Sequence, residues 1–151
     1  MKKILLAVDG SEKSQKAAKK ARTLAVALKA EITLLTVITD IIHFGSSGFS
    51  PENFSPVQTQ EIMEQNRKQA EAKAEKILSE VEKFLKEKNI KIKKEIKCGD
   101  SADNICEFAD KGDFDMIILA DKGEGGVKRF LLGSTSDKVV HHANTSVLIV
   151  K

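Results

Sequence analysis

The sequence predicts an α/β protein built on an open five-stranded parallel sheet with helices on both faces. Two observations lead to this fold class. Short apolar runs of strand length recur along the 151 residues, and segments with apolar residues at helical spacing alternate with them. Mostly apolar strands are typical of parallel sheets covered on both faces, and alternating strands and helices form such sheets through right-handed crossovers.

Five segments have the length and composition of strands. One of them, IKIKKEIK at 90–97, differs from the others because apolar residues alternate with lysines. That pattern suits a strand with one face near solvent, so we expect it at or near a sheet edge. The other expected strands are residues 3–8, 31–38, 114–120 and 146–150.

The first two helices show clear stripes of apolar residues. The first is expected to begin after Ser11 as its N-cap. The second is expected over 57–89 as a long charged helix with one buried face. That face contains Met63, Ala70, Ala74, Ile77, Val81 and Phe84.

The last two helices are shorter. We expect Ser101 to cap the third and Gly112 to close it at the C′ position. The fourth is expected to run from about Ser134 to His142. With five strands and four helices, the 151 residues form a single domain.

Composition and charge exclude several classes of partner. The 25 basic and 22 acidic residues give a net charge of +3, and they are spread along the chain, so nucleic acid is not an expected partner. No apolar segment approaches the roughly 20 residues that span a bilayer. The two cysteines, Cys98 and Cys106, match no metal or redox spacing and suit a reducing cytoplasm.

Ligands of open α/β sheets bind beyond the carboxyl ends of the strands. Two loops at these strand ends are candidates for ligand binding. One is Asp9, Gly10 and Ser11 after the first strand, and the other is the stretch GEGGVKRFLLGST at 123–135 after the fourth. The second loop ends at a helix N-terminus, where free N–H groups and the helix dipole favour phosphate. Asp9 would repel phosphate, but it suits ribose hydroxyls or the adenine amino group.

Standard nucleotide motifs do not account for the glycine loop. The Walker pattern G-x-x-x-x-G-K-[ST] does not occur in the chain. The dinucleotide pattern G-x-G-x-x-G fails because Lys128 stands at the third glycine position, and because the loop follows the fourth strand. The loop therefore calls for a different explanation.

The chain resembles the universal stress protein family. The stretch DMIILADKGEGGVKRFLLGSTSDKVVHHANTSVLIVK is similar to that family's C-terminal signature, and KILLAVDGSEKSQKAAKKA to its first strand and helix. LLTVI and CGDSADNICEFADKGDFDMII fit the pattern between them. The resemblance covers nearly the whole chain except roughly residues 39 to 60.

The resemblance implies a fold and an assembly. It implies one universal stress protein domain over 1–151, with an adenine nucleotide alpha-hydrolase-like fold and strand order 3-2-1-4-5. Members commonly form homodimers through the last strand, here SVLIV at 146–150. A homodimer is expected because this apolar edge would otherwise remain unpaired.

The resemblance also implies a nucleotide site. Nucleotide-binding members carry G-x2-G-x9-G-[ST], and Gly123, Gly133 and Ser134 match this pattern, whereas Ala120 replaces its first glycine. Thr135 belongs to the same phosphate cradle. For adenine and ribose, the matching residues are Ala7, Asp9 and Val37. The expected cofactor is ATP, alone or with Mg²⁺ or Mn²⁺ bound through its phosphates.

Each of these residues also has a purely structural interpretation. Gly133 and Ser134 can be a turn and an N-cap, with Asp137 completing a capping box. Asp9 can simply favour the start of a helix, and Val37 belongs to the core whether or not its backbone meets adenine. The basic pair Lys128 and Arg129 can be solvated, and His141 and His142 suit a helix C-terminus better than a catalytic or metal site.

The segment from Thr39 to Pro56 is the least constrained part of the chain. Its 18 residues combine five bulky apolar side chains with glycines, serines and both prolines. One hypothesis is a mobile flap over the nucleotide or against a partner subunit. The other is a small apolar cluster that covers the long helix.

Three functions remain open. The first is a cytoplasmic ATP-binding homodimer that regulates the stress response through partners. The second is a slow or partner-dependent ATP hydrolase, for which no convincing catalytic or metal-binding pair is found beyond Asp9 and Asp121. The third is a nucleotide-free dimer that binds partner proteins, which Ala120 makes credible. We expect the first, with no catalytic residues.

Overall fold

A computed structural model describes residues 2–39, 53–86, 89–122 and 132–151. Its centre is an all-parallel sheet of five strands in the order β3-β2-β1-β4-β5. The predicted fold class and strand order are confirmed. The strands are β1 (Lys3–Ala7), β2 (Glu31–Ile38), β3 (Ile92–Cys98), β4 (Met116–Ala120) and β5 (Ser146–Val150).

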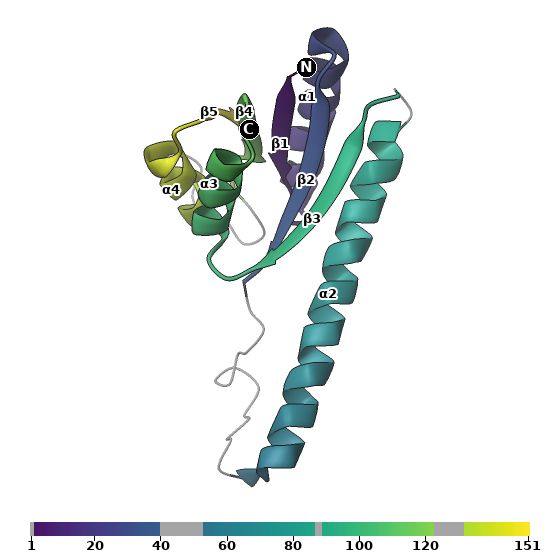
Figure 1. Ribbon diagram of the computed structural model, residues 1–151, viewed down its shortest axis with the longest axis vertical. Helices are drawn as coiled ribbons and strands as arrows, with labels where there is room; N and C mark the ends of the chain where they lie inside the picture. Colours follow the sequence, from purple (N-terminus) through teal and green to yellow (C-terminus); the bar gives the residue numbers. More distant parts are fainter. Residues whose placement is uncertain (1, 40–52, 87–88, 123–131) are drawn as a thin grey trace.

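The helices lie in two layers, one on each face of the sheet (Figure 1). One core joins the first face to α1 and α2, and the other joins the second face to α3 and α4. Among the described helices none is long and apolar enough to cross a membrane. The helices are α1 (Glu12–Leu28), α2 (Pro56–Lys86), α3 (Ser101–Lys111) and α4 (Ser134–His142).

The apolar run of β1 supplies both cores. Ile4 and Leu6 pack on the side of α1 and α2, whereas Leu5 between them packs on the side of α3 and α4. Successive side chains of a strand point to opposite faces, so a strand covered on both sides needs apolar residues at every position. The lysine-rich β3 is an edge strand, as its alternating pattern predicts.

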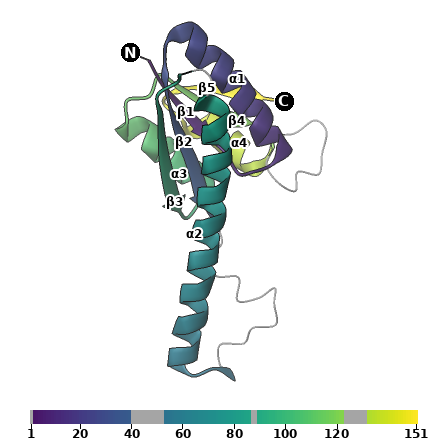
Figure 2. The same cartoon turned by 90° about the vertical axis from the view of Figure 1, so that its right-hand side faces the viewer.

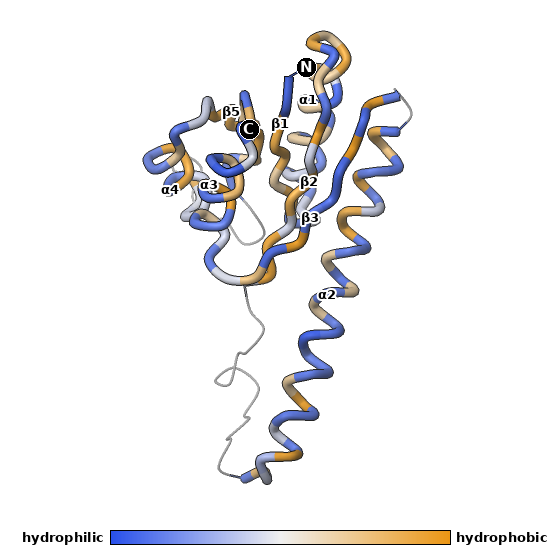
Figure 3. The backbone as a smooth tube through the Cα atoms, in the orientation of Figure 1, coloured by the Kyte–Doolittle hydropathy of each residue, from blue (hydrophilic) through white to orange (hydrophobic). Residues whose placement is uncertain are grey.

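The long helix α2 packs on the sheet with only its second half. Its buried residues begin at Ala74, and its first half projects beyond the sheet (Figures 1 and 2). Figure 3 shows mostly hydrophilic colours along this projecting half. The predicted buried face is therefore wrong for Met63 and Ala70, which lie on this half and do not belong to the described core. The sequence analysis also missed Leu78 and Leu85, whose side chains are fully buried.

The third helix begins one residue earlier than the cap prediction. Asp100, and not Ser101, is the N-cap of α3. Its carboxylate accepts the N–H groups of Ala102 at 2.9 Å and Asp103 at 3.0 Å. A carboxylate is a stronger acceptor than a hydroxyl at the positive end of a helix, which explains the choice. Gly112 does end the helix, although with φ of −94° and not in a left-handed conformation.

Several predictions fall on residues outside the described ranges. These are Gly123, Lys128, Arg129 and most of the segment from Thr39 to Pro56. Their proposed roles stay predictions.

The cap of α3 allows a test of stability against pH. Hydrogen bonds from the Asp103 N–H and from the Lys138 ammonium lower the pKa of Asp100 below its ordinary value of 3.8. A carboxylate with a depressed pKa stabilises the fold fully above that ordinary value, and this contribution is lost as the pH falls through the folded pKa. We expect Asp100→Ala to lower the free energy of unfolding by about 1 kcal/mol at neutral pH.

Urea unfolding of both proteins, near neutral pH and at a pH of about 2, measures this difference. The gap between wild type and variant should shrink in acid. Equal stability at neutral pH, or a gap that does not depend on pH, would contradict the assignment of Asp100 as the cap.

Candidate functional site

The candidate site lies where β1 and β4 end side by side. Leu6 pairs with Ile118 in the register of these strands, so Asp9 and Asp121 each follow a paired residue by three positions. The two loops therefore leave the same edge of the sheet at neighbouring strands. Here the order of strands reverses, because the chain runs outward to β2 and β3 on one side and to β4 and β5 on the other. Such points are the usual ligand sites of open α/β sheets.

Short-range hydrogen bonds hold the loop after β1. The Asp9 Oδ1 accepts the N–H of Ser11 at 3.0 Å, and the Ser11 Oγ accepts the N–H of Ser14 at 3.1 Å. Gly10 has φ of +84°, and a Cβ there would lie 3.0 Å from the side chain of Ile77. The prediction that Ser11 caps α1 is confirmed. Asp9 is exposed, with its carboxylate at the start of this helix.

The end of β4 is tied to the start of α4. The carbonyl oxygen of Asp121 accepts the N–H of Gly133 at 2.7 Å and the Oγ–H of Ser136 at 2.5 Å. Ser136 is buried, and its hydroxyl also lies 3.0 Å from the carbonyl oxygen of Gly133. The sequence analysis missed Ser136. Its signal was a third hydroxyl residue after Ser134 and Thr135, on the inner side of the helix.

The first turn of α4 has no side-chain cap. Its N-cap is Gly133, and no side chain accepts a hydrogen bond from the helix start in the described part of the chain. The predicted capping role of Asp137 is therefore wrong, and its carboxylate lies 3.8 Å from the Nδ1 of His141. Because α1 and α3 do have side-chain caps, α4 differs from both in leaving its first N–H groups to other acceptors.

Glycine at position 133 permits a close approach of two backbone segments. A Cβ at this position would lie 3.2 Å from the Cα of Lys122 and 3.3 Å from the carbonyl oxygen of Asp121. Both neighbours are backbone atoms, so a larger residue would push the end of β4 away from α4. A substitution of Gly133 therefore disturbs the fold at this junction as well as any ligand.

The other predicted site residues gather at the same edge of the sheet. Ala7, Val37 and Ala120 are partly buried near the carboxyl ends of β1, β2 and β4. The hydroxyl of Thr36 donates to the carbonyl oxygen of Val8 at 2.9 Å and links the ends of β2 and β1. At the helix start, Ser134 is exposed and Thr135 is partly buried.

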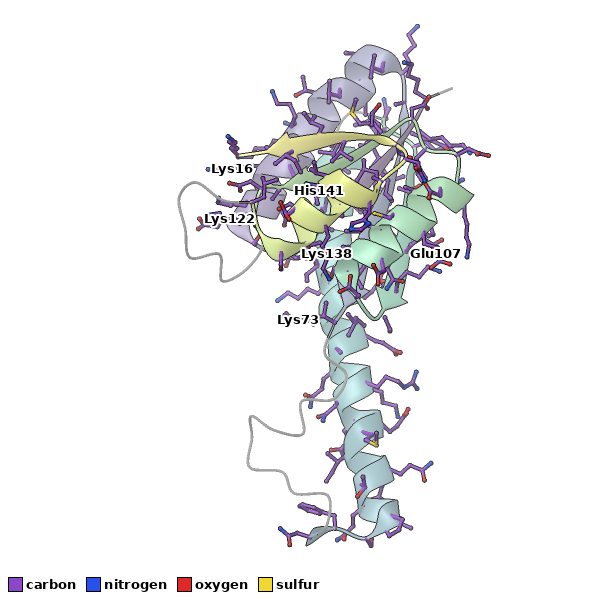
Figure 4. All side chains as sticks on the ribbon, turned by 90° about the vertical axis from the view of Figure 1, so that its left-hand side faces the viewer. Lys16, Lys73, Glu107, Lys122, Lys138 and His141 are labelled. Carbon is purple, nitrogen blue, oxygen red and sulfur yellow. The ribbon has the colours of Figure 1, made fainter. Side chains whose placement is uncertain are left out.

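An ion pair that the sequence analysis did not identify joins the two loops. The Lys13 ammonium of α1 lies 2.7 Å from the Asp121 carboxylate. Burial would raise the pKa of Asp121, but the hydrogen bond from Lys13 and the charges of Lys13 and Lys122 outweigh it and lower the pKa. Lys122 is itself only 8% exposed. Figure 4 shows it on the same side of the domain as Lys16 of α1, away from Glu107 of α3.

The described residues also form a groove between α2 and β3, away from this site. This groove has a volume of about 520 Å³ and does not include the predicted site residues. It is lined by Lys68, Glu71, Ala72, Glu75, Ile96 and Cys98.

The remaining candidate side chains show no metal chemistry. Across the described ranges, no group of three His, Cys, Asp or Glu residues is placed to hold a metal ion. Burial raises the pKa of the Cys106 thiol, which disfavours the reactive thiolate form. The Nδ1–H of His141 donates to the carbonyl oxygen of Asp137, 2.8 Å away, within α4.

The sequence model of the universal stress protein family matches residues 1–151. The chain belongs to this family. Universal stress protein MJ0531 of Methanocaldococcus jannaschii is 33% identical over 150 residues, which cover 99% of this chain and 82% of that protein.

Solved structures of universal stress proteins share the fold. The structure of MJ0577, also from M. jannaschii, has a TM-score of 0.82 at 27% identity and covers 99% of this chain and 95% of its own. The protein UspA from Lactobacillus plantarum has a TM-score of 0.81 at 25% identity, with 99% and 97% covered.

Some more distant universal stress proteins have been solved with adenine nucleotides. A protein from Arabidopsis thaliana holds AMP, at 21% identity and a TM-score of 0.67, and it covers all of this chain and 92% of its own. One from Archaeoglobus fulgidus is in complex with dAMP, at 16% identity and a TM-score of 0.68, with 100% and 98% covered. At these identities the likeness to the present chain concerns the fold alone.

Proposed function

We propose that this universal stress protein binds ATP at the carboxyl edge of its sheet and acts as a regulatory module in the stress response. The observation that carries the proposal is the start of α4. It is a helix N-terminus at the strand-order reversal, and no side chain caps it within the described ranges. Free N–H groups together with the helix dipole favour an anion there. The hydroxyls of Ser134 and Thr135 supply further donors next to them.

The adenosine end of the nucleotide is assigned to β1 and β2. Asp9 carries an exposed carboxylate at the tip of β1, and ribose hydroxyls are suitable donors to it. The partly buried Ala7 and Val37 offer small apolar surfaces and strand-end backbone groups for the base. Relatives with AMP and dAMP support an adenine nucleotide as the ligand class.

The residues present fit such a ligand, with one departure. Ala120 replaces the first glycine of the family's nucleotide motif. It closes β4 as a partly buried residue in regular strand structure, where an alanine is tolerated. The proposal allows for a divalent cation, Mg²⁺ or Mn²⁺, bound through the phosphates of ATP.

Binding, and not catalysis, is the proposed activity. Phosphoryl transfer needs a metal clamp and a residue that orients the attacking group. Of the two acids at the site, Asp121 is engaged by Lys13, and Asp9 accepts the N–H of Ser11. Steady release of ADP that Ser134→Ala abolishes would instead favour a slow hydrolase. The cysteines, which match no redox spacing, fit a cytoplasmic location.

The proposal includes a homodimer that pairs through β5. This strand forms one edge of the sheet, and Val147 to Val150 are only partly buried in the single chain. Sedimentation should give the mass of two chains for wild type and of one chain for Ile149→Lys, because a charge on this edge opposes its pairing. Val57→Lys, on the projecting half of α2, is the control and should remain a dimer. A wild-type monomer would contradict the proposed assembly.

The nucleotide assignment is tested at Asp9. Calorimetric titration with ATP should show binding by wild type and a loss of tenfold or more in affinity for Asp9→Asn, because hydrogen bonds to a charged acceptor contribute about 1.5 to 3 kcal/mol. Asp113→Asn is the matched control. It removes the same charge just before β4, at the amino-terminal ends of the strands and away from the site. The φ of 50° at this position suits asparagine.

Binding by the control should equal that of wild type. A wild-type protein that binds no ATP, and carries none when purified, would leave the nucleotide-free partner-binding dimer as the better account. Equal affinities for Asp9→Asn and wild type would remove Asp9 from the site.

A further inference from the structure

We propose that Lys13 determines how many phosphate groups this site accepts. It does so by neutralising the carboxylate of Asp121, a residue next to the start of α4, where phosphate is proposed to bind. This inference rests on the proposed nucleotide function and adds to it a charge-selecting residue outside the glycine motif. The observation behind it is the ion pair of Lys13 with Asp121.

Backbone hydrogen bonds hold Asp121 next to the start of α4. Its carbonyl oxygen accepts the N–H of Gly133 and the hydroxyl of Ser136, and its own N–H donates to the carbonyl oxygen of Val150 at 2.9 Å. The residue cannot move away from the start of α4 without breaking these hydrogen bonds. Its backbone is therefore fixed beside the N–H groups that are proposed to hold phosphate, and its carboxylate lies 2.7 Å from the Lys13 ammonium of α1.

An isolated carboxylate at this place would oppose phosphate binding. The Asp121 side chain is 14% exposed, so water screens its charge only partly. The lowered pKa of Asp121 means that the carboxylate is ionised at neutral pH. Phosphate binding therefore depends on nearby cations that offset the negative charge of Asp121.

Two lysines offset the negative charge of Asp121, and they come from different segments of the chain. Lys122 follows Asp121 directly in the chain and is nine-tenths buried. Lys13 comes from the first turn of α1, just after the loop that follows β1, and its side chain is 39% exposed. Together the three groups carry a net charge of +1. Without Lys13 the net charge is zero, and without the Asp121 carboxylate it is +2.

This charge balance makes a prediction that a structural role for the ion pair does not make. Lys13→Gln and Asp121→Asn both break the same bridge between α1 and β4. If the bridge only held the loops in place, both variants would weaken nucleotide binding. If the net charge of these groups controls nucleotide affinity, Lys13→Gln weakens binding and Asp121→Asn strengthens it.

The experiment is a titration of wild type and variants with ATP and with AMP, in EDTA and 0.15 M salt. ATP carries about four negative charges and AMP about two. We expect Lys13→Gln to lower the affinity about tenfold for ATP and about threefold for AMP, and Asp121→Asn to raise both. The double variant keeps the net charge of wild type and should bind within about threefold of it.

Lys20→Gln is the matched control. It removes a lysine from an exposed position of the same helix, about 10 Å further along its axis, and should bind as wild type does in 0.15 M salt, where charges at this distance are largely screened. Thermal unfolding should show the same small loss of stability for Lys13→Gln and Asp121→Asn, because each loses one partner of the pair.

The outcomes separate the two proposals. Opposite effects of the two single variants, larger for ATP than for AMP, establish Lys13 as the charge-selecting residue. Weaker binding by both variants, or equal effects on ATP and AMP, overturns that role and leaves the nucleotide function intact. A wild-type protein that binds neither nucleotide overturns both.

Discussion

The peptide group at Asp121 connects the parts of the molecule on which the account depends. Its N–H donates to the last residue of β5, Val150, and its carbonyl oxygen accepts from Gly133 and Ser136 at the start of α4. A single residue thus joins the ends of two strands to a helix N-terminus. Glycine at 133 favours this close approach of the two backbones, since an added Cβ would lie a tight 3.2 Å from the Cα of Lys122.

This junction also explains why acidic and basic groups lie together at the site. The backbone of Asp121 is fixed at the start of α4, and its carboxylate meets the ammonium of Lys13, in the first turn of α1, at 2.7 Å. The first loop carries its own acid, Asp9, at the start of α1. Acid at one end and cations with helix N–H groups at the other suit a ligand with a neutral, hydroxyl-bearing end and an anionic end, which describes a nucleotide.

Much of the architecture is predictable because local patterns agree with tertiary packing. The helix from Ser134 to His142 and the strand at 146–150 have the expected bounds, and the lysines of 90–97 indicate an edge strand correctly. The buried face of α2 is harder to predict, since apolar periodicity does not reveal that only the half from Ala74 onward meets the sheet. The hydrogen bond from Ser136 to Asp121 and the ion pair of Lys13 with Asp121 join distant segments, so no local pattern reveals these partners. Gly123, the middle glycine of the nucleotide motif, remains a prediction.

The central claim is that the first N–H groups of α4 receive phosphate. The most direct measurement is an amide NMR titration of the labelled protein with ATP and, in parallel, with adenosine. The account predicts large shifts at Ser134 and Thr135 with ATP only, and shifts near Asp9 with both ligands. Shifts confined to the groove between α2 and β3, or an α4 start that responds equally to adenosine and ATP, would contradict it.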